Sequence, residues 1–208
     1  MKGFIFISLL IITGNINAET YRGLEISPEV NTPAYSRSQY KHWIDADNND
    51  VNTRFEVLDE ESWYLVTWDE KSNGDWFVVD GLWNCPYTGK SYTDPSDIDI
   101  DHMVPLKEVH QSGGHAWSNE KKQAYANDLN DPKTLVAVKD SSNQSKGHKD
   151  PAEWLPPNRA YWCEYLENWV SVKKNWNLTV DQAEVDALKE GFKVCKKYIN
   201  GDKLEGRH

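Results

Sequence analysis

A short segment in the middle of the chain alternates between acidic and branched apolar residues and then reaches a proline. It reads Asp97-Ile98-Asp99-Ile100-Asp101-His102-Met103-Val104-Pro105-Leu106. Alternation at a period of two predicts a β-strand with the aspartates on one face and the isoleucines and His102 on the other. A carboxylate and an imidazole at one strand end, with an amide from a second element, can hold a divalent metal and activate water. That set of groups is the minimum for hydrolysing a phosphodiester bond.

Further short motifs follow in a fixed order. They are Ala126-Asn127-Asp128-Leu129, Leu135-Val136-Ala137-Val138, Asn143-Gln144-Ser145-Lys146-Gly147 and Asp150-Pro151-Ala152-Glu153-Trp154. With Ile100 to Leu106, they resemble the HNH, or ββα-metal, nuclease family, and most closely its secreted bacterial branch. The resemblance extends to Thr53-Arg54-Phe55-Glu56-Val57-Leu58 and Pro86-Tyr87-Thr88-Gly89, and so covers most of the chain.

The resemblance implies an α+β fold with a ββα-metal (HNH, or His-Me finger) core and added N-terminal strands and C-terminal helices. We expect the core at about residues 97–155, with a second strand at 134–138 and a helix after Asn143. Residues 40–208 would form a single nuclease domain, preceded by an extended N-terminal arm at residues 19–39.

The resemblance also assigns roles to three side chains. His102 would be the general base, because an imidazole can take a proton from the attacking water. Asp101 and Asn143 would be oxygen ligands of one divalent metal, with Mg²⁺ expected and Mn²⁺ as the alternative. The competing interpretations are a core histidine, a turn aspartate and a helix-capping asparagine.

Several other residues are candidates for supporting roles. Lys146, Arg54 and His148 are expected to contact the substrate, although Lys146 and His148 can also be read as solvated surface residues. The loop that carries the histidine is usually braced by an Asn or His in this family. Thr134 stands at that position by spacing, and Asn127 or Asn130 is the alternative brace.

An acidic loop from Asp45 to Glu56 follows the template of a calcium-binding loop. Asp50 stands where the template has glycine, and aspartate tolerates the left-handed conformation at some cost. A solvated acidic turn explains the same residues equally well. The candidate ligands of a structural Ca²⁺ are Asp45, Asp47, Asn49, Val51 and Glu56.

The three cysteines show no Cys-x-x-Cys spacing, which argues against a thiolate zinc site. Cys163 and Cys195 fall on two predicted terminal helices and are expected to form a disulfide. Cys85 is then free or pairs with another chain.

The first 18 residues are expected to form a signal peptide, because one lysine precedes a short apolar run and small residues follow. The mature protein would be secreted or periplasmic, soluble, without a membrane span, and monomeric. The net charge of −10 is the wrong sign for binding nucleic acid through bulk electrostatics. It argues against a DNA coat protein or repressor, but a nuclease needs only a local cationic groove.

The local patterns predict further elements. We expect a helical turn at 40–45, strands at 55–58, 62–68 and 76–79 with a turn at Asn73-Gly74, a helix from Ser118 to Leu129 and two C-terminal helices. Thr179 and Gln182 suggest a capping box for the last helix, whose apolar stripe is Val185, Leu188, Phe192 and Cys195.

The leading hypothesis is an exported, metal-dependent endonuclease that cleaves DNA, and RNA as a second substrate, with little sequence specificity. Another class remains open: a catalytically inactive extracellular binding module on the same scaffold, stabilised by calcium or zinc. A third hypothesis is a phosphodiesterase or phosphatase acting on small nucleotides. Whether an immunity or inhibitor protein exists is left open by the sequence.

Overall fold

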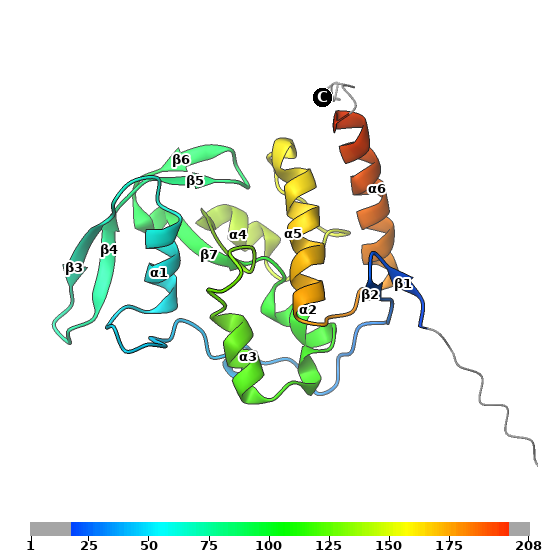
Figure 1. The fold of residues 1–208 in the computed structure, drawn as a ribbon, viewed down its shortest axis with the longest axis horizontal. Helices are drawn as coiled ribbons and strands as arrows, with labels where there is room; N and C mark the ends of the chain where they lie inside the picture. Colours follow the sequence, from blue (N-terminus) through cyan, green and yellow to red (C-terminus); the bar gives the residue numbers. More distant parts are fainter. Residues whose placement is uncertain (1–17, 200–208) are drawn as a thin grey trace, which may run out of the picture.

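The computed structural model describes residues 18–199 and shows a mixed α and β fold (Figure 1). The strands form two-stranded antiparallel sheets, each made of two strands consecutive in the chain. The strands are β1 (Thr20–Tyr21), β2 (Leu24–Glu25), β3 (Thr67–Glu70), β4 (Trp76–Asp80), β5 (Trp83–Cys85), β6 (Lys90–Tyr92), β7 (Ile98–His102) and β8 (Leu135–Lys139). The helices are α1 (Thr53–Glu60), α2 (Leu106–Gln111), α3 (Asn119–Ala126), α4 (Asp140–Lys146), α5 (Trp162–Asn175) and α6 (Gln182–Ile199).

The centre of the molecule is the pair β7 and β8 with the helix α4. The strands pair from Ile98 opposite Lys139 to His102 opposite Leu135, and α4 packs on both strands. The predicted strand ending at His102 is therefore confirmed, and the second strand lies one residue later than the predicted 134–138. Asn143 lies inside α4, whereas the sequence placed the helix after it.

The C-terminal helices form the largest part of the core. Figure 1 shows α5 and α6 side by side, and the predicted stripe on α6 is buried at Val185, Leu188 and Phe192. A side chain at Gly191 would place its Cβ 2.3 Å from Leu166 Cδ1, so this position needs glycine for the helices to approach. The predicted disulfide between Cys163 and Cys195 is present and joins the two helices, while Cys85 is free and buried.

Some local predictions were wrong. The segment 55–58 was expected to be a strand, because phenylalanine and valine favour strands, but it lies in α1. The side chain of Asn52 caps this helix by accepting from the Arg54 amide. The predicted strand at 62–68 is mostly irregular, since β3 begins only at Thr67. Instead of a helical turn at 40–45, the structure has a 3₁₀ turn at Arg37–Gln39.

The turns and caps near other elements follow the sequence more closely. Gly74 adopts a φ of 94° in the turn between β3 and β4, as the Asn73-Gly74 pair predicts. Ser118 caps α3, although that helix ends at Ala126 and not at Leu129.

The cap of α6 differs from the predicted Thr179–Gln182 pair. Asp181 and Glu184 each accept from the other's backbone amide. Thr179 is instead used in a tertiary contact, because both its amide and its hydroxyl donate to the Ser112 carbonyl.

The N-terminal segment is packed against the body over much of its length. It begins with the β1–β2 hairpin, and Ile26 then pairs with Val180 just before α6. Further along, the Val30 amide donates to the Gln111 carbonyl at 2.9 Å. The predicted extended arm at 19–39 is thus a strap that runs along α2 towards the end of β7.

The predicted signal peptide lies outside the described residues except for Ala18. Between residues 18 and 199, the structure contains no helix with the length and apolar character needed to cross a membrane.

A buried cation connects three helices. The Lys173 ammonium on α5 lies 2.7 Å from Glu108 on α2 and 2.6 Å from Glu184 on α6, and none of the lysine side chain is exposed. It also donates to the hydroxyl of Ser112 and the carbonyl of Thr179. Removing one member of such a group leaves buried charge without a partner.

Lys173→Met should therefore destabilise the protein strongly. We expect the free energy of unfolding to fall by about 3–5 kcal/mol, because two buried carboxylates lose their cation. Urea unfolding at neutral pH measures the change. The exposed neighbour gives a matched control, and Lys174→Met should change stability by less than about 0.5 kcal/mol. Equal effects of the two substitutions would contradict the role of Lys173.

Candidate active site

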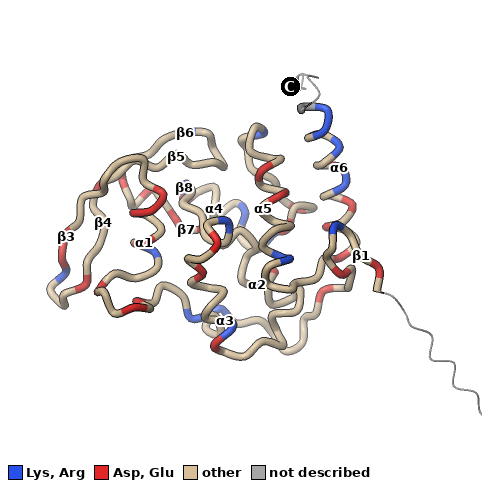
Figure 2. Tube along the Cα trace, in the orientation of Figure 1, with Lys and Arg blue, Asp and Glu red and all other residues tan. Residues whose placement is uncertain are grey.

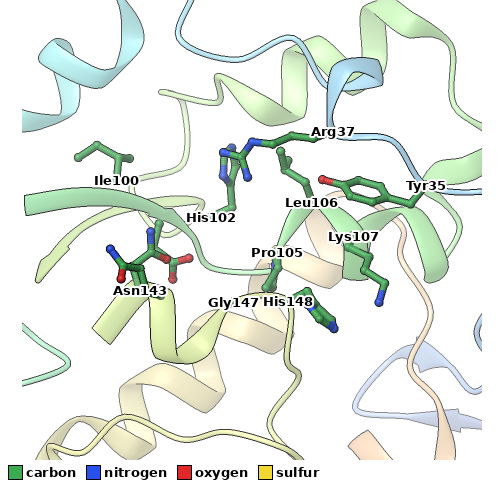
Figure 3. Close-up of a pocket in the computed structure, with 12 residues that line it drawn as sticks. Tyr35, Arg37, Ile100, His102, Pro105, Leu106, Lys107, Asn143, Gly147 and His148 are labelled. Atoms are coloured by element: carbon green, nitrogen blue, oxygen red, sulfur yellow. The ribbon is translucent and has the colours of Figure 1, made fainter. Parts of the chain in front are cut away.

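A cavity of about 330 Å³ lies where β7 ends (Figure 3). Asp101 and His102 line it from β7, and Asn143 lines it from α4. Tyr35 and Arg37 reach it from the N-terminal strap. The remaining walls include Pro105, Leu106, Lys107, Gln144, Gly147 and His148.

His102 is held on three sides within this cavity. Its imidazole is stacked between the rings of Trp43, at 5.6 Å, and Tyr125, at 5.9 Å. Its Nε2 lies 3.0 Å from the carbonyl oxygen of Ala126. Since a carbonyl only accepts, Nε2 carries the proton, and the lone pair of the neutral ring is on Nδ1. Burial lowers the pKa of His102 to about 3, so the ring is a free base at neutral pH.

The Asp101 carboxylate is 4% exposed and is bound at one oxygen. Its Oδ2 accepts from the Tyr87 hydroxyl and from the Lys146 ammonium, each at 2.5 Å. Burial raises the pKa of Asp101 and lowers that of Lys146, and the charge of each partner opposes the shift of the other. The hydrogen bonds found among residues 18–199 leave Oδ1 of Asp101 uncommitted.

The side chain of Asn143 is oriented by a residue of β7, the strand that carries Asp101 and His102. Its amide nitrogen donates to Asp99 Oδ2 at 3.1 Å, which leaves the amide oxygen for a ligand. Asp101, His102 and Asn143 therefore line one cavity, although Asn143 lies some forty residues further along the chain. A carboxylate oxygen and an amide oxygen form a donor set that suits a hard divalent cation.

One of the three predicted substrate contacts, that of Lys146, is wrong. Lys146 is fully buried, and besides Asp101 it donates to the carbonyls of His102 and Met103. Arg54 is also turned inward and donates to the carbonyls of Pro95 and Ile98. Both cations hold the backbone around β7, and Lys146, which has no exposed surface, cannot reach a polyanion. Contact between the half-buried Arg54 and the substrate stays a prediction. His148 is exposed and lines the cavity, as the prediction requires.

Two of the three residues considered as braces, Thr134 and Asn127, make hydrogen bonds close to His102. Thr134 Oγ1 donates to Asp128 Oδ2 at 2.9 Å, and the Thr134 carbonyl accepts from the Met103 amide just after His102. Asn127 makes four hydrogen bonds, which hold the chain next to the Ala126 carbonyl that binds His102. They join its side chain to Lys41 O, Gln123 O, Ile44 N and Thr53 Oγ1.

The predicted calcium loop is closed by hydrogen bonds between its own backbone amides and carboxylates. The carboxylate of Asp45 accepts from the amides of Asn49 and Asp50, and Asp47 also accepts from Asn49. Asp50 has a φ of 65°, the left-handed conformation that the template expects of a glycine. Binding of Ca²⁺ by Asp45, Asp47, Asn49, Val51 and Glu56 stays a prediction.

Several residues that shape the site were not identified from the sequence. Trp43, which has a left-handed φ of 57°, and Arg37 precede every motif that we recognised. Only the folded chain places Arg37 on the cavity wall and Trp43 on the His102 ring. Tyr125 could have been found, since it immediately precedes the Ala126-Asn127 motif. Tyr87 lies in the Pro-Tyr-Thr-Gly motif, to which we assigned no role.

Residues 53–190 match the family described as GmrSD restriction endonucleases, C-terminal domain. The chain belongs to this family. Membership indicates a nuclease-type function, and the site described above lies largely within the matched residues. No solved structure matches the chain.

The chain is also similar to an uncharacterized secreted protein of Arthroderma benhamiae. The two are 38% identical over 173 residues, which is 83% of this chain and 81% of the relative. Because this relative is fungal, the expected link to a bacterial branch is not supported.

Asn127→Ala should destabilise the chain, because it removes four hydrogen bonds around the end of α3. We expect a loss of about 2–3 kcal/mol in the free energy of unfolding, measured with urea. Asn130 is exposed and three residues away, so Asn130→Ala should change stability by less than about 0.5 kcal/mol. If Asn127→Ala is as stable as Asn130→Ala, Asn127 does not brace the site.

Proposed function

We propose that this protein is a metal-dependent endonuclease that hydrolyses phosphodiester bonds in DNA with little sequence specificity, and RNA is left open as a further substrate. The observation that carries the proposal is the placement of His102. Its Nε2 is occupied by the Ala126 carbonyl, and its Nδ1 is free in a cavity that Asp101 and Asn143 also line. Membership of a restriction-endonuclease domain family supports the same reaction class.

The unit of β7, β8 and α4 is, in this proposal, a ββα-metal core of HNH type. Two antiparallel strands are followed directly by a helix that packs on both of them. The proposed base is at the end of the first strand, and the proposed ligand Asn143 is in the helix.

The proposed ligands of the divalent ion are Asp101 and Asn143. Each has a side-chain oxygen outside the hydrogen bonds that orient it. Mg²⁺ accepts such oxygens and keeps several waters, and Mn²⁺ is the alternative. An ion held there would polarise the phosphate and stabilise the charge on the departing oxygen.

His102 takes the proton of the attacking water on Nδ1. The imidazolium that forms keeps its Nε2–H bond to the Ala126 carbonyl, which stabilises the positive charge. Trp43 and Tyr125 restrict the ring to one orientation, so the base does not have to be ordered when substrate arrives. Lys146 fixes the Asp101 carboxylate from behind and leaves its other oxygen for the ligand role.

We further propose that the protein is exported and mature from about residue 19. The related fungal protein is named as secreted, and the first 18 residues have the composition of a signal peptide. The disulfide between Cys163 and Cys195 suits an oxidising compartment.

The test is digestion of a supercoiled plasmid by the purified protein. Nicking should require Mg²⁺ or Mn²⁺ and stop with excess chelator, and His102→Ala should lower the rate by about 10²–10⁴-fold, because the base is lost. His115 provides a matched control, since it is half-buried and does not line the cavity, and His115→Ala should keep the parent rate. Nicking that survives chelation or the loss of the His102 imidazole would overturn the mechanism.

A further inference from the structure

The strap that precedes the matched family domain forms one wall of the active site. The family match begins at residue 53, whereas Tyr35, Arg37 and Trp43 lie before it. Tyr35 and Arg37 line the cavity, and Trp43 stacks on His102. The residues matched to the family are therefore completed by a segment that precedes them.

The strap is fixed on both sides of Arg37. Before it, His110 Nε2 donates to the Pro33 carbonyl at 2.8 Å. After it, Lys122 donates to Gln39 Oε1 at 3.1 Å, and the Tyr40 side chain is fully buried. The backbone of Arg37 is therefore held at the rim of the cavity before any ligand binds.

The Arg37 guanidinium is free to bind an anion. In Figure 3 the side chain runs from the strap to the His102 ring. Its one hydrogen bond among the described residues is at 3.3 Å to His42 Nε2, an acceptor because Nδ1 of His42 donates to the Tyr40 carbonyl. None of the ion pairs found in residues 18–199 involves Arg37. Most of its five donors therefore face solvent and the cavity.

The charge around the cavity is opposite to that of the whole chain. The net charge is −10, and Figure 2 shows acidic positions along β3 and around α1. The cavity is lined by the cations Arg37 and Lys107, and the one carboxylate in its lining, Asp101, is paired with buried Lys146. A phosphate entering the cavity meets a local cation even though the protein as a whole repels it.

We propose that Arg37 binds a phosphate of the nucleic-acid backbone next to the bond that is cut. The strap would thus supply the phosphate contact that buried Lys146 cannot make. Because guanidinium can bind two phosphate oxygens at once, the contact also orients the strand over His102. This inference rests on the proposed nuclease function.

The experiment measures binding in a chain that cannot cut. A fluorescein-labelled 12-base-pair DNA duplex is titrated with His102→Ala protein by fluorescence anisotropy at several salt concentrations. Adding Arg37→Gln should weaken binding by about tenfold and reduce the slope of log affinity against log salt by about 1, because one phosphate contact is lost. Arg37→Lys should restore part of the salt slope, since its charge remains.

Arg159 provides the matched control. It is exposed, stacks on Trp162 and does not line the cavity, so Arg159→Gln should leave both affinity and salt slope unchanged. If the parent cleaves plasmid but Arg37→Gln binds the duplex as tightly and with the same salt slope, the inference is overturned and the nuclease function stands. A parent chain that neither cleaves plasmid nor binds the duplex overturns both.

Discussion

The site depends on one buried ion pair, between Lys146 of α4 and Asp101 of β7. The ammonium has no exposed surface, and it also donates to the carbonyls of His102 and Met103, where the strand ends. One cation therefore fixes the helix to the strand, neutralises one oxygen of a buried carboxylate and holds the backbone of His102, the proposed general base. Removing either partner would leave an uncompensated charge in the interior, which is far more costly than losing a surface pair.

Around this ion pair, other parts of the chain fix the orientation and the tautomer of the His102 ring. Trp43 and Tyr125 restrict its ring to one plane, and the Ala126 carbonyl selects the tautomer. Asn127 holds that carbonyl in place through four side-chain hydrogen bonds, to Lys41, Ile44, Thr53 and Gln123. Residues from the strap, α3 and β7 thus act on one imidazole, and this convergence explains why a segment before the family domain belongs to the site.

Elements whose apolar residues repeat at the period of a strand or a helix could be predicted, because burial of one face decides their secondary structure. The strand ending at His102 and the apolar stripe of α6 follow from sequence spacing. The Cys163–Cys195 disulfide was expected because both cysteines fall on the predicted terminal helices. The conformation of segment 55–58 could not be predicted from its own residues. They favour a strand, whereas a helix capped by Asn52 begins two residues before them. The motif predicts that Asp101, His102 and Asn143 lie close together, and the structure places them around one cavity, whereas Lys146 was misjudged. A cation near a nuclease motif suggests phosphate binding, and only the fold shows that Lys146 is buried.

The most direct test of this account is the protonation state of His102 in solution. Long-range ¹H–¹⁵N correlation spectra of protein labelled with ¹⁵N-histidine distinguish the two ring nitrogens, and His102→Ala identifies the signals. At neutral pH we predict a neutral ring with the proton on Nε2 and none on Nδ1, as the bond to the Ala126 carbonyl requires. A proton on Nδ1, in the other tautomer or in an imidazolium, would leave no base facing the cavity and would contradict the account.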